Sequence, residues 1–315
     1  MKNMFEVLKG LSEIDLIALT AFKQWWLEPA AGNDARSGKT LEQSLDTLAE
    51  AYSRLTTGKN ETIYLVGDGA TTGTARVDSA FTWAKSQSNL VGVTAPTLYS
   101  QLARIAPTST ATAFANFFTV SGDGNVFKNL QFLQDFGTDG DNQVALTVSG
   151  HRNVFQNCHI GGIAKGSDAG GRCLKISGQE NLFENCVIGL DTIDRSAANA
   201  SIEFLSGAAR NVFRNCIFAI RATATTVLLV KVASAAGIGR FNLFEDCTVY
   251  NHGTHTIAGL CTLPASAGGY LGFVRAALLG PITGYGTDST TRGQIYIIGP
   301  TDGSTTAGVS YIPSA

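Results

Sequence analysis

The strongest pattern of apolar and polar positions along the chain is an octapeptide that returns five times. Its copies are NVFKNLQF, NVFQNCHI, NLFENCVI, NVFRNCIF and NLFEDCTV, which begin at Asn125, Asn153, Asn181, Asn211 and Asn242. Successive copies start 28 to 31 residues apart, and a degenerate copy, LGFVRAAL, follows at Leu271. A period of this size is typical of helical arrays, leucine-rich repeats or β-solenoids.

The residue types within each unit favour strands. Each octapeptide follows a second apolar segment that ends in Ser-Gly, such as FFTVSG at 117–122 and CLKISG at 173–178. The units are rich in Val, Phe, Thr and Ile, whereas helical arrays need apolar residues at i, i+3, i+4 and i+7. Each unit therefore predicts two strands joined by a Ser-Gly corner.

The second asparagine of the octapeptide marks a bend. In the copy from Asn153, the apolar residues are Phe155, Cys158 and Ile160, so the alternation slips by one residue around Asn157. Asparagine adopts the left-handed backbone conformation more readily than other non-glycine residues. We therefore expect a column of corner residues whose side chains hydrogen-bond as a ladder along the solenoid. Its members are Asn129, Asn157, Asn185, Asn215 and Asp246.

The same register predicts two interior columns. The first is a stack of rings: Phe127, Phe155, Phe183, Phe213, Phe244 and Phe273. The second is formed by Leu130, Cys158, Cys186, Cys216 and Cys247. We expect the cysteines to be reduced, because no CxxC pair and no nearby histidine in finger spacing occurs in the sequence.

The motif φ-x-φ-S-G-x-x-N-φ-F-x-N-C-x-φ, repeated over residues 117–280, resembles right-handed parallel β-helix proteins of the pectate-lyase-like group. The predicted fold class is all-β, a single right-handed parallel β-helix (solenoid) of roughly seven or eight coils. Two copies depart from the pattern. Before Asn211, Glu203 aligns with Phe118, Leu146 and Leu174 of its relatives, and before Asn242, VLLVKVASAAGIGRF replaces the short Ser-Gly corner. Local bulges or a shifted register are expected there.

The flanking segments are expected to close the ends of the solenoid. A capping-box start from Thr40 to Gln43 predicts a helix that covers the open first coil. QIYIIGPTDGSTTAGVSYI predicts two strands around a Gly-containing turn. The expected organisation is an N-terminal helical arm at 1–38, a capping helix at 39–61, the β-helix at 62–280 and a C-terminal β cap at 281–315.

Apolar residues cover more than one face of the predicted helical arm, which begins at Ser12 and ends before Pro29. A solvated helix does not tolerate this distribution, so the arm should pack on its own solenoid, on sibling subunits or on another protein. Adjacent tryptophans are typical interface anchors. The predicted interface residues are Phe5, Leu8, Ile14, Ile17, Phe22, Trp25 and Trp26.

Composition narrows the range of partners. Charged residues make up 15% of the chain, and the net charge of -2 provides no basic field for nucleic acid or anionic lipid. Neither partner is expected. The N-terminus has no uninterrupted apolar run, so we expect synthesis in a cytoplasm without membrane insertion.

Candidate catalytic groups lie in predicted loops. Enzymes with this fold need an acidic calcium site with a basic residue, or close carboxylates for hydrolysis. The candidates are Asp135, Asp139, Asp141, Asp191, Asp194, Arg195, His252 and His255. Their spacing favours solvated turns, so no catalytic residue, no metal and no cofactor is expected, and neither is turnover of acidic polysaccharides.

Two classes of function remain. The region NDARSGKT, the predicted capping helix and TIYLVGDG resemble phage-borne β-helix proteins, which implies a non-enzymatic structural protein of the virion. The first hypothesis is a capsid decoration or cement protein, attached through its arm. The resemblance implies a homotrimer that binds other virion proteins, the major capsid protein among them. The alternative is a tailspike-like or lyase-like protein that binds or cleaves a glycan.

Overall fold

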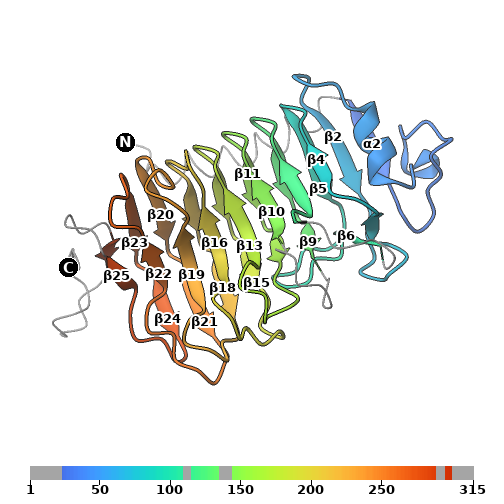
Figure 1. Cartoon of the computed structure of the whole chain (residues 1–315). Coiled ribbons are helices and arrows are strands. Elements are labelled where there is room, and N and C mark those ends of the chain that lie inside the picture. The colour runs from blue at the N-terminus through green and yellow to red at the C-terminus, as the bar shows by residue number, and fades with distance from the viewer. Residues whose placement is uncertain (1–22, 109–114, 135–143, 289–294, 300–315) are drawn as a thin grey trace, which may run out of the picture.

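The structure, a computed structural model, describes residues 23–108, 115–134, 144–288 and 295–299. The chain winds into an elongated parallel β-helix whose strands stack along its length (Figure 1). Each coil supplies one strand to each of three sheets, and every strand pairs in parallel with its copy in the neighbouring coil. The predicted β-solenoid is confirmed, and two of the sheets contain eight strands each.

We name the sheets A, B and C in the order in which the chain visits them. Sheet A contains β1 (Gln24–Leu27), β2 (Glu61–Leu65), β5 (Ser88–Gly92), β8 (Val126–Lys128), β11 (Val154–Gln156), β14 (Leu182–Glu184), β17 (Val212–Arg214), β20 (Phe241–Glu245), β23 (Tyr270–Val274) and β26 (Ile295–Ile298). Sheet B contains β3 (Ala75–Val77), β6 (Arg104–Pro107), β9 (Gln131–Leu133), β12 (His159–Gly161), β15 (Val187–Gly189), β18 (Ile217–Ile220), β21 (Thr248–Asn251) and β24 (Ala277–Leu279). Sheet C contains β4 (Phe81–Trp83), β7 (Phe118–Val120), β10 (Val144–Val148), β13 (Arg172–Ile176), β16 (Ala200–Phe204), β19 (Leu228–Val232), β22 (Cys261–Leu263) and β25 (Gly286–Asp288).

The phenylalanines of the octapeptide form one continuous interior stack. The rings of Phe155 and Phe183 lie 4.7 Å apart and within 5° of parallel, and those of Phe183 and Phe213 lie 4.8 Å apart. The stack runs from Phe127 to Phe273, and all its members are buried. Each ring therefore has its apolar face covered by the coils above and below, which one unit alone could not achieve.

The second asparagine of each octapeptide turns the corner between sheets A and B. The five corner residues have φ between 52° and 55°, in the left-handed region: Asn129, Asn157, Asn185, Asn215 and Asp246. Among the described residues, one direct bond joins two of these side chains, from Asn157 Nδ2 to Asn129 Oδ1 at 2.8 Å. Asp246 instead forms an ion pair with Arg275 at 2.6 Å. The corner column is thus a conformational repeat rather than a continuous ladder.

The continuous ladder is formed by the first asparagine of the octapeptide, which the sequence pattern did not distinguish from an ordinary strand end. The side-chain oxygen of each residue accepts the backbone N–H of the preceding copy, as from Asn153 N to Asn181 Oδ1 at 2.9 Å. Asn181 Nδ2 also donates to Gly150 O and to Asn211 Oδ1. The column is buried throughout: Asn125, Asn153, Asn181, Asn211 and Asn242. These amides satisfy backbone groups that the corner between sheets C and A leaves without strand partners.

The cysteine column is buried, and its thiols are free. Each Sγ lies against the carbonyl of a phenylalanine in the preceding coil, as for Cys186 and Phe155 O at 3.3 Å. Burial raises the pKa of the Cys158 and Cys216 thiols, which suppresses the reactive thiolate.

We expect mass spectrometry of the unreduced protein to find no linked peptides among Cys158, Cys186, Cys216 and Cys247. Stacked coils hold equivalent Cβ atoms about 4.8 Å apart, beyond the usual disulfide range of about 3.5–4.5 Å. Iodoacetamide should label these thiols slowly in the native protein and rapidly in guanidinium. Rapid labelling of the native protein would contradict their burial.

The register of β16 corrects the sequence alignment around Glu203. Strand pairing places Ile202 beside Leu174, and Glu203 beside Lys175. The connection from this strand to its octapeptide is two residues longer than in the preceding coil, since six residues lie between Phe204 and Asn211 and four between Ile176 and Asn181. One of the extra residues, Leu205, precedes the Ser-Gly dipeptide, and its N–H donates to Ile176 O. Glu203 therefore lies on the exterior face of sheet C and not at an interior position.

The N-terminal end also differs from the prediction. Trp25 and Trp26 do not end a helix but lie in β1, which pairs in parallel with β2. The alternation of the strand separates them: Trp25 is buried beneath the Lys39 ammonium, and Trp26 lies half-buried on the ring of Tyr64. The predicted contacts Phe5, Leu8, Ile14, Ile17 and Phe22 lie outside the described residues.

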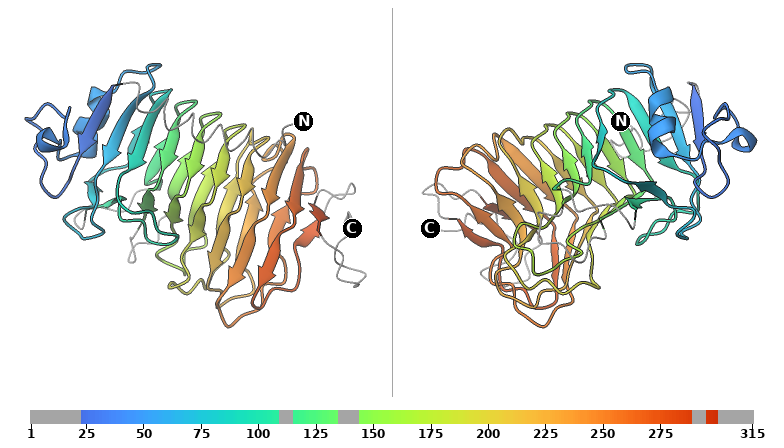
Figure 2. Two further views of the ribbon diagram at one scale, coloured as in Figure 1. Left: turned by 180° about the vertical axis from the view of Figure 1, so that it is seen from behind. Right: turned by 45° about the vertical axis from the view of Figure 1, so that its right-hand side comes forward.

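The predicted capping helix is present but shorter than expected: a loop and a 3-10 helix take up its first half, and an α-helix forms over Leu48–Arg54. The loop covers the outer edge of β1, since Trp26 N–H donates to Gly38 O and Leu45 N–H donates to Trp26 O, both at 2.8 Å. The helices are η1 (Leu41–Gln43), a 3-10 helix at the predicted capping box, and α2 (Leu48–Arg54) at the end of the rod (Figure 2). The outer edge of β1, the terminal strand of sheet A, is therefore occupied by this loop and not open to another strand.

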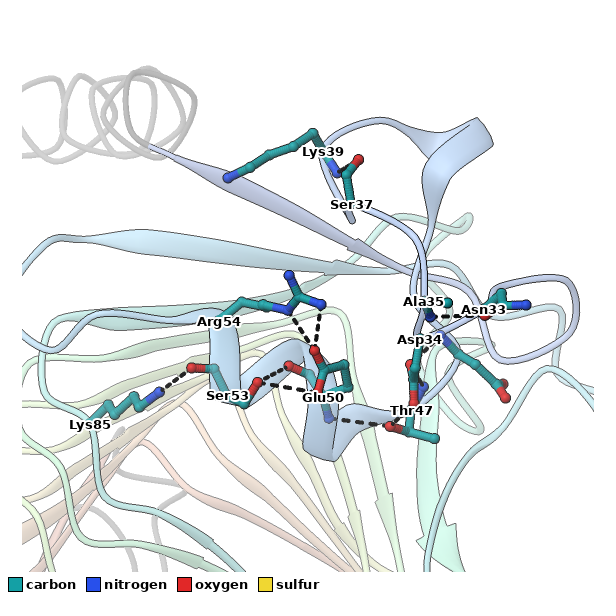
Figure 3. Close-up of polar contacts among 11 residues, drawn as sticks. Asn33, Asp34, Ala35, Ser37, Lys39, Thr47, Glu50, Ser53, Arg54 and Lys85 are labelled. Atoms are coloured by element: carbon teal, nitrogen blue, oxygen red, sulfur yellow. Dashed lines mark hydrogen bonds and ion pairs between the residues drawn. The ribbon is translucent and has the colours of Figure 1, made fainter.

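Polar side chains hold this cap together (Figure 3). Asp34 accepts hydrogen bonds from the backbone N–H groups of Asp46 and Thr47 and from the Thr47 hydroxyl, at 2.7–3.0 Å. Thr47 Oγ1 accepts the Glu50 N–H and so caps α2. At the other end, Lys85 Nζ donates to three carbonyls of residues 52–55, which stabilises the helix C-terminus.

The solenoid extends beyond the predicted range of 62–280 at both ends. β1 precedes it, and β25 and β26 add parallel strands to sheets C and A. Ile295–Ile298 therefore continues the β-helix. The predicted turn and second strand of the C-terminal cap, within 300–315, lie outside the described residues. None of the helices in the described ranges is long and apolar enough to cross a membrane.

Candidate functional site

The exterior of sheet C carries a cluster of charged side chains. Strand register aligns one exterior column along the rod, with threonines at both ends and charges in the middle: Thr82, Thr119, Thr147, Lys175, Glu203, Lys231 and Thr262. Because stacked strands lie about 4.8 Å apart, the three charged side chains of neighbouring coils meet.

Three cations surround the Glu203 carboxylate. Its oxygens lie 3.2 Å from Arg172 Nε, 3.9 Å from Lys175 Nζ and 3.6 Å from Lys231 Nζ. Three cations and one carboxylate leave the cluster with a net charge of +2. We call these four residues the basic cluster.

The four side chains of the basic cluster differ in exposure: two are buried, and the other two form an accessible rim. The side chains of Arg172 and Glu203 are 3% and 10% exposed, whereas those of Lys175 and Lys231 are 20% and 40% exposed. Arg172 Nη1 also donates to Ala169 O and Gly171 O, so its position is held by the loop before β13. The two lysines are the groups that a ligand could reach.

Burial and the neighbouring charges change the pKa of the Lys175 ammonium. Burial lowers its pKa from the ordinary value, the Glu203 carboxylate raises it, and the positive charges of Arg172 and Lys231 lower it again. An anion placed at the rim would relieve the repulsion among the cations. The arrangement is therefore suited to binding an anionic group and not to two-carboxylate hydrolysis, because Glu203 is already held by cations.

The loop candidates from the sequence do not assemble into one site in the described structure. Asp194 forms an ion pair with Arg221 at 2.7 Å. Arg195 is buried, and its guanidinium donates to Asn199 Oδ1, Ser201 Oγ and Leu228 O. Burial lowers the pKa of Arg195 to about 10. Arg195 thus fastens its loop to sheet C.

The remaining candidates are scattered. His252 and His255 are exposed, and His255 Nδ1 lies 3.2 Å from the hydroxyl of its neighbour Thr254. Asp135, Asp139 and Asp141 lie outside the described residues. Within the described ranges, no group of three or more His, Cys, Asp or Glu residues could hold a metal ion.

The sequence analysis did not predict the basic cluster, because the repeats were aligned on their Ser-Gly dipeptides. That alignment placed Glu203 in the core, one position away from its true partners Lys175 and Lys231. Aligning the octapeptides alone would not have corrected the error, since the two extra residues lie upstream of the octapeptide. An alternation of apolar and polar residues through IEF, with Ile202 and Phe204 inward, is the signal that could have found it.

Comparison with known proteins shows a similarity of fold only. No protein-family model matches the sequence, and no curated protein matches it. Among solved structures, pectate lyase Pel9A is similar at 16% identity and a TM-score of 0.60, over 87% of this chain and 68% of that chain. A pectin methylesterase from Aspergillus niger is similar at 15% identity and a TM-score of 0.50, over 91% of both chains. ORF18 of Geobacillus virus E2 matches at 13% identity and a TM-score of 0.44, over 82% of this chain and 59% of that chain.

The similarity to the pectate lyase and the pectin methylesterase is a similarity of fold, that of pectate-lyase-like parallel β-helix proteins. An identity of 15–16% carries no residue role from these enzymes to this chain.

Proposed function

We propose that the chain is a non-enzymatic structural protein of a tailed-phage virion, a capsid decoration or cement protein attached through its N-terminal segment. The observation that carries the non-enzymatic part is Glu203, a carboxylate on the exterior of sheet C that is held by three cations. A general acid or base needs a carboxyl group that is free to exchange a proton with substrate. The phage assignment rests on the resemblance of residues 33–69 to phage-borne β-helix proteins.

The first coil supports attachment at the N-terminal end of the rod. Trp26 and Tyr64 form an aromatic pair on the exterior of sheet A, with ring centroids 5.2 Å apart, close to Lys23, where residues 1–22 join the described chain. Aromatic side chains that are half-buried on an exterior face are typical anchors of protein interfaces. Trp25 has no such role, because it packs inside.

Deletion of residues 1–22 tests the attachment. The shortened protein should keep the thermal unfolding transition of the full chain, because β1 and the cap lie outside the deletion. It should no longer co-sediment with purified capsids that lack this protein. Light scattering of the full and shortened chains tests whether the chain forms the proposed homotrimer and whether residues 1–22 are needed for it. Trp26→Ala in the full chain should weaken binding, whereas Phe241→Ala, an exposed aromatic residue on another coil, should not. Normal capsid binding by the deletion variant would contradict the proposal.

The basic cluster favours a second candidate function, the binding of an acidic glycan along sheet C. Its net positive charge, its accessible lysines and the threonine hydroxyls along the same column provide partners for carboxylate and hydroxyl groups. Two of the structural neighbours are a pectate lyase and a pectin methylesterase, which supports a uronate polymer as the first probe.

Titration calorimetry with polygalacturonate tests this second candidate. Replacing both Lys175 and Lys231 by glutamine should weaken binding at least about tenfold, since each lysine is expected to contribute on the order of 1 kcal/mol. Lys128→Gln, on the exterior of sheet A, is the matched control and should bind normally. Binding should fall with salt and be absent for uncharged dextran. Equal binding by the double variant and the control would rule out the basic cluster as the site.

A further inference from the structure

A long connection replaces the short corner between β5 and β6. The following coil uses only Asn129 and Leu130 between β8 and β9, whereas residues 93–103 separate β5 from β6. The connection crosses to the second coil further along, where it contacts Asn157 and His159. We call residues 93–103 the strap. Val93 and Leu98 are 46% and 53% exposed, so the strap is held by few buried groups.

Gln101 is the first anchor of the strap. Its Nε2 atom donates to Asn157 O at 3.1 Å and approaches Asn157 Oδ1 at 3.3 Å. Its Oε1 atom accepts the Thr97 N–H, which folds the strap upon itself. None of these groups changes its charge at ordinary pH, so this anchor does not respond to acid.

His159 is the second anchor, and its ring is fully bonded in the neutral state. Ser100 N–H donates to His159 Nδ1 at 3.1 Å, and Tyr99 packs edge-on against the ring with centroids 5.8 Å apart. His159 Nε2 lies 2.9 Å from Gly189 O, which can only accept. Nε2 therefore carries the proton, and Nδ1 is the acceptor.

A second donor confirms this tautomer. Gln131 Oε1 accepts a hydrogen bond from Arg104 Nε at 2.7 Å, so the Gln131 amide turns its NH₂ group toward His159 Nδ1 at 3.0 Å. Two N–H donors thus point at one lone pair. A proton on Nδ1 would face both donors and break the bond that holds Ser100.

We propose that His159 is an acid-sensitive latch: protonation of its Nδ1 atom releases the strap from the exterior of sheet B while the coils stay folded. The charged and titratable groups around the ring are Tyr99 of the strap, Arg104 on β6, Cys186 before β15 and Asp191 after β15. Arg104 opposes the imidazolium and Asp191 favours it. Release would uncover Gln131 and His159, which are buried in the closed state.

The direction of the pH dependence follows from the environment of the ring. Burial, the largest effect, lowers the pKa of His159 in the closed state below its ordinary value. In the open state the pKa returns to about 6.5. The closed state is therefore fully favoured above about pH 6.5 and loses stability as the pH falls below that value.

Hydrogen exchange of the full chain, read by mass spectrometry, tests the latch. Labelling times at pH 7.5 and pH 5.0 are matched for the intrinsic exchange rate. Protection of peptides within residues 93–103 should fall roughly 10- to 30-fold at pH 5.0, the factor expected for an open-state pKa of about 6.5. Peptides from residues 181–189 of the central coils should stay protected. Equal protection of the strap at both pH values would overturn the proposal.

Three variants identify the titrating group. His159→Gln should abolish the pH dependence, whereas His255→Gln, an exposed histidine in another loop, should leave it unchanged. Asp191→Asn keeps His159 and removes the carboxylate that favours its charged form in the closed state, so the closed-state pKa falls further. The gap to the open-state pKa then widens, and the loss of strap protection at pH 5.0 should be at least as large as in the unchanged chain. The Asp191 variant also provides a test if His159→Gln does not fold. Persistence of pH-dependent release in His159→Gln, or a smaller loss of protection at pH 5.0 in Asp191→Asn, would show that another group controls the strap.

Discussion

Replacing Phe183 by alanine should lower the free energy of unfolding by about 3–5 kcal/mol. The ring is fully buried and stacks on Phe155 and Phe213 at 4.7 and 4.8 Å. Its removal leaves a cavity that the stacked backbones of three coils cannot close, because hydrogen bonds to both neighbours hold each strand in place. Equilibrium unfolding in guanidinium chloride gives the change in stability.

Phe241→Ala is the matched control for the Phe183 substitution. Both changes remove the same side chain from a strand of sheet A, but Phe241 is 40% exposed. Its loss should cost less than about 1 kcal/mol. A similarly small loss for Phe183→Ala would contradict its place in the interior stack.

Replacing Asn181 by alanine should cost about 2–6 kcal/mol in the free energy of unfolding, because each buried polar group left without a partner costs about 1–3 kcal/mol. The change removes the acceptor of Asn153 N–H and the donor to Gly150 O, and the site is buried. The same unfolding measurement applies, and hydrogen exchange should show faster exchange at the Asn153 amide.

The second asparagine of the same octapeptide offers the control. Asn185 is exposed and has φ of 53°, so glycine can replace it without strain. Asn185→Gly should change stability by less than about 1 kcal/mol. If Asn185→Gly proved as destabilising as Asn181→Ala, the corner residues and not the buried asparagines would form the structural ladder.

Most of the fold could be predicted because each column repeats one residue type at one place in the coil. Phe155 and Cys158 lie in the same buried environment as the equivalent residues of the neighbouring coils. The repeat of these residue types along the sequence therefore indicates how adjacent coils pack. The left-handed corner at Asn157 follows from the intrinsic conformational preference of asparagine. These features depend on local residue identity and on a period.

The errors occurred where a tertiary contact overrides the local pattern. The tryptophans at 25 and 26 fit the end of a helix, but pairing with β2 gives this segment backbone partners and draws it into a strand. Likewise, the first asparagine of the octapeptide looks like an ordinary strand end. Its role as a ladder arises only when Asn153 and Asn181 are stacked in adjacent coils.

The sequence by itself determined the β-solenoid, the ring and cysteine columns and the corner positions. In each column the equivalent residues of adjacent coils bury one another, so the repeat in the sequence directly indicates the packing. Only the tertiary structure decided the two features that bear on function. The basic cluster depends on a one-residue shift that brings Glu203 between Lys175 and Lys231. The strap depends on contacts between Ser100 and His159, 59 residues apart. Neither contact repeats, so no period along the chain could indicate it, and each arises only from the path of the chain in three dimensions.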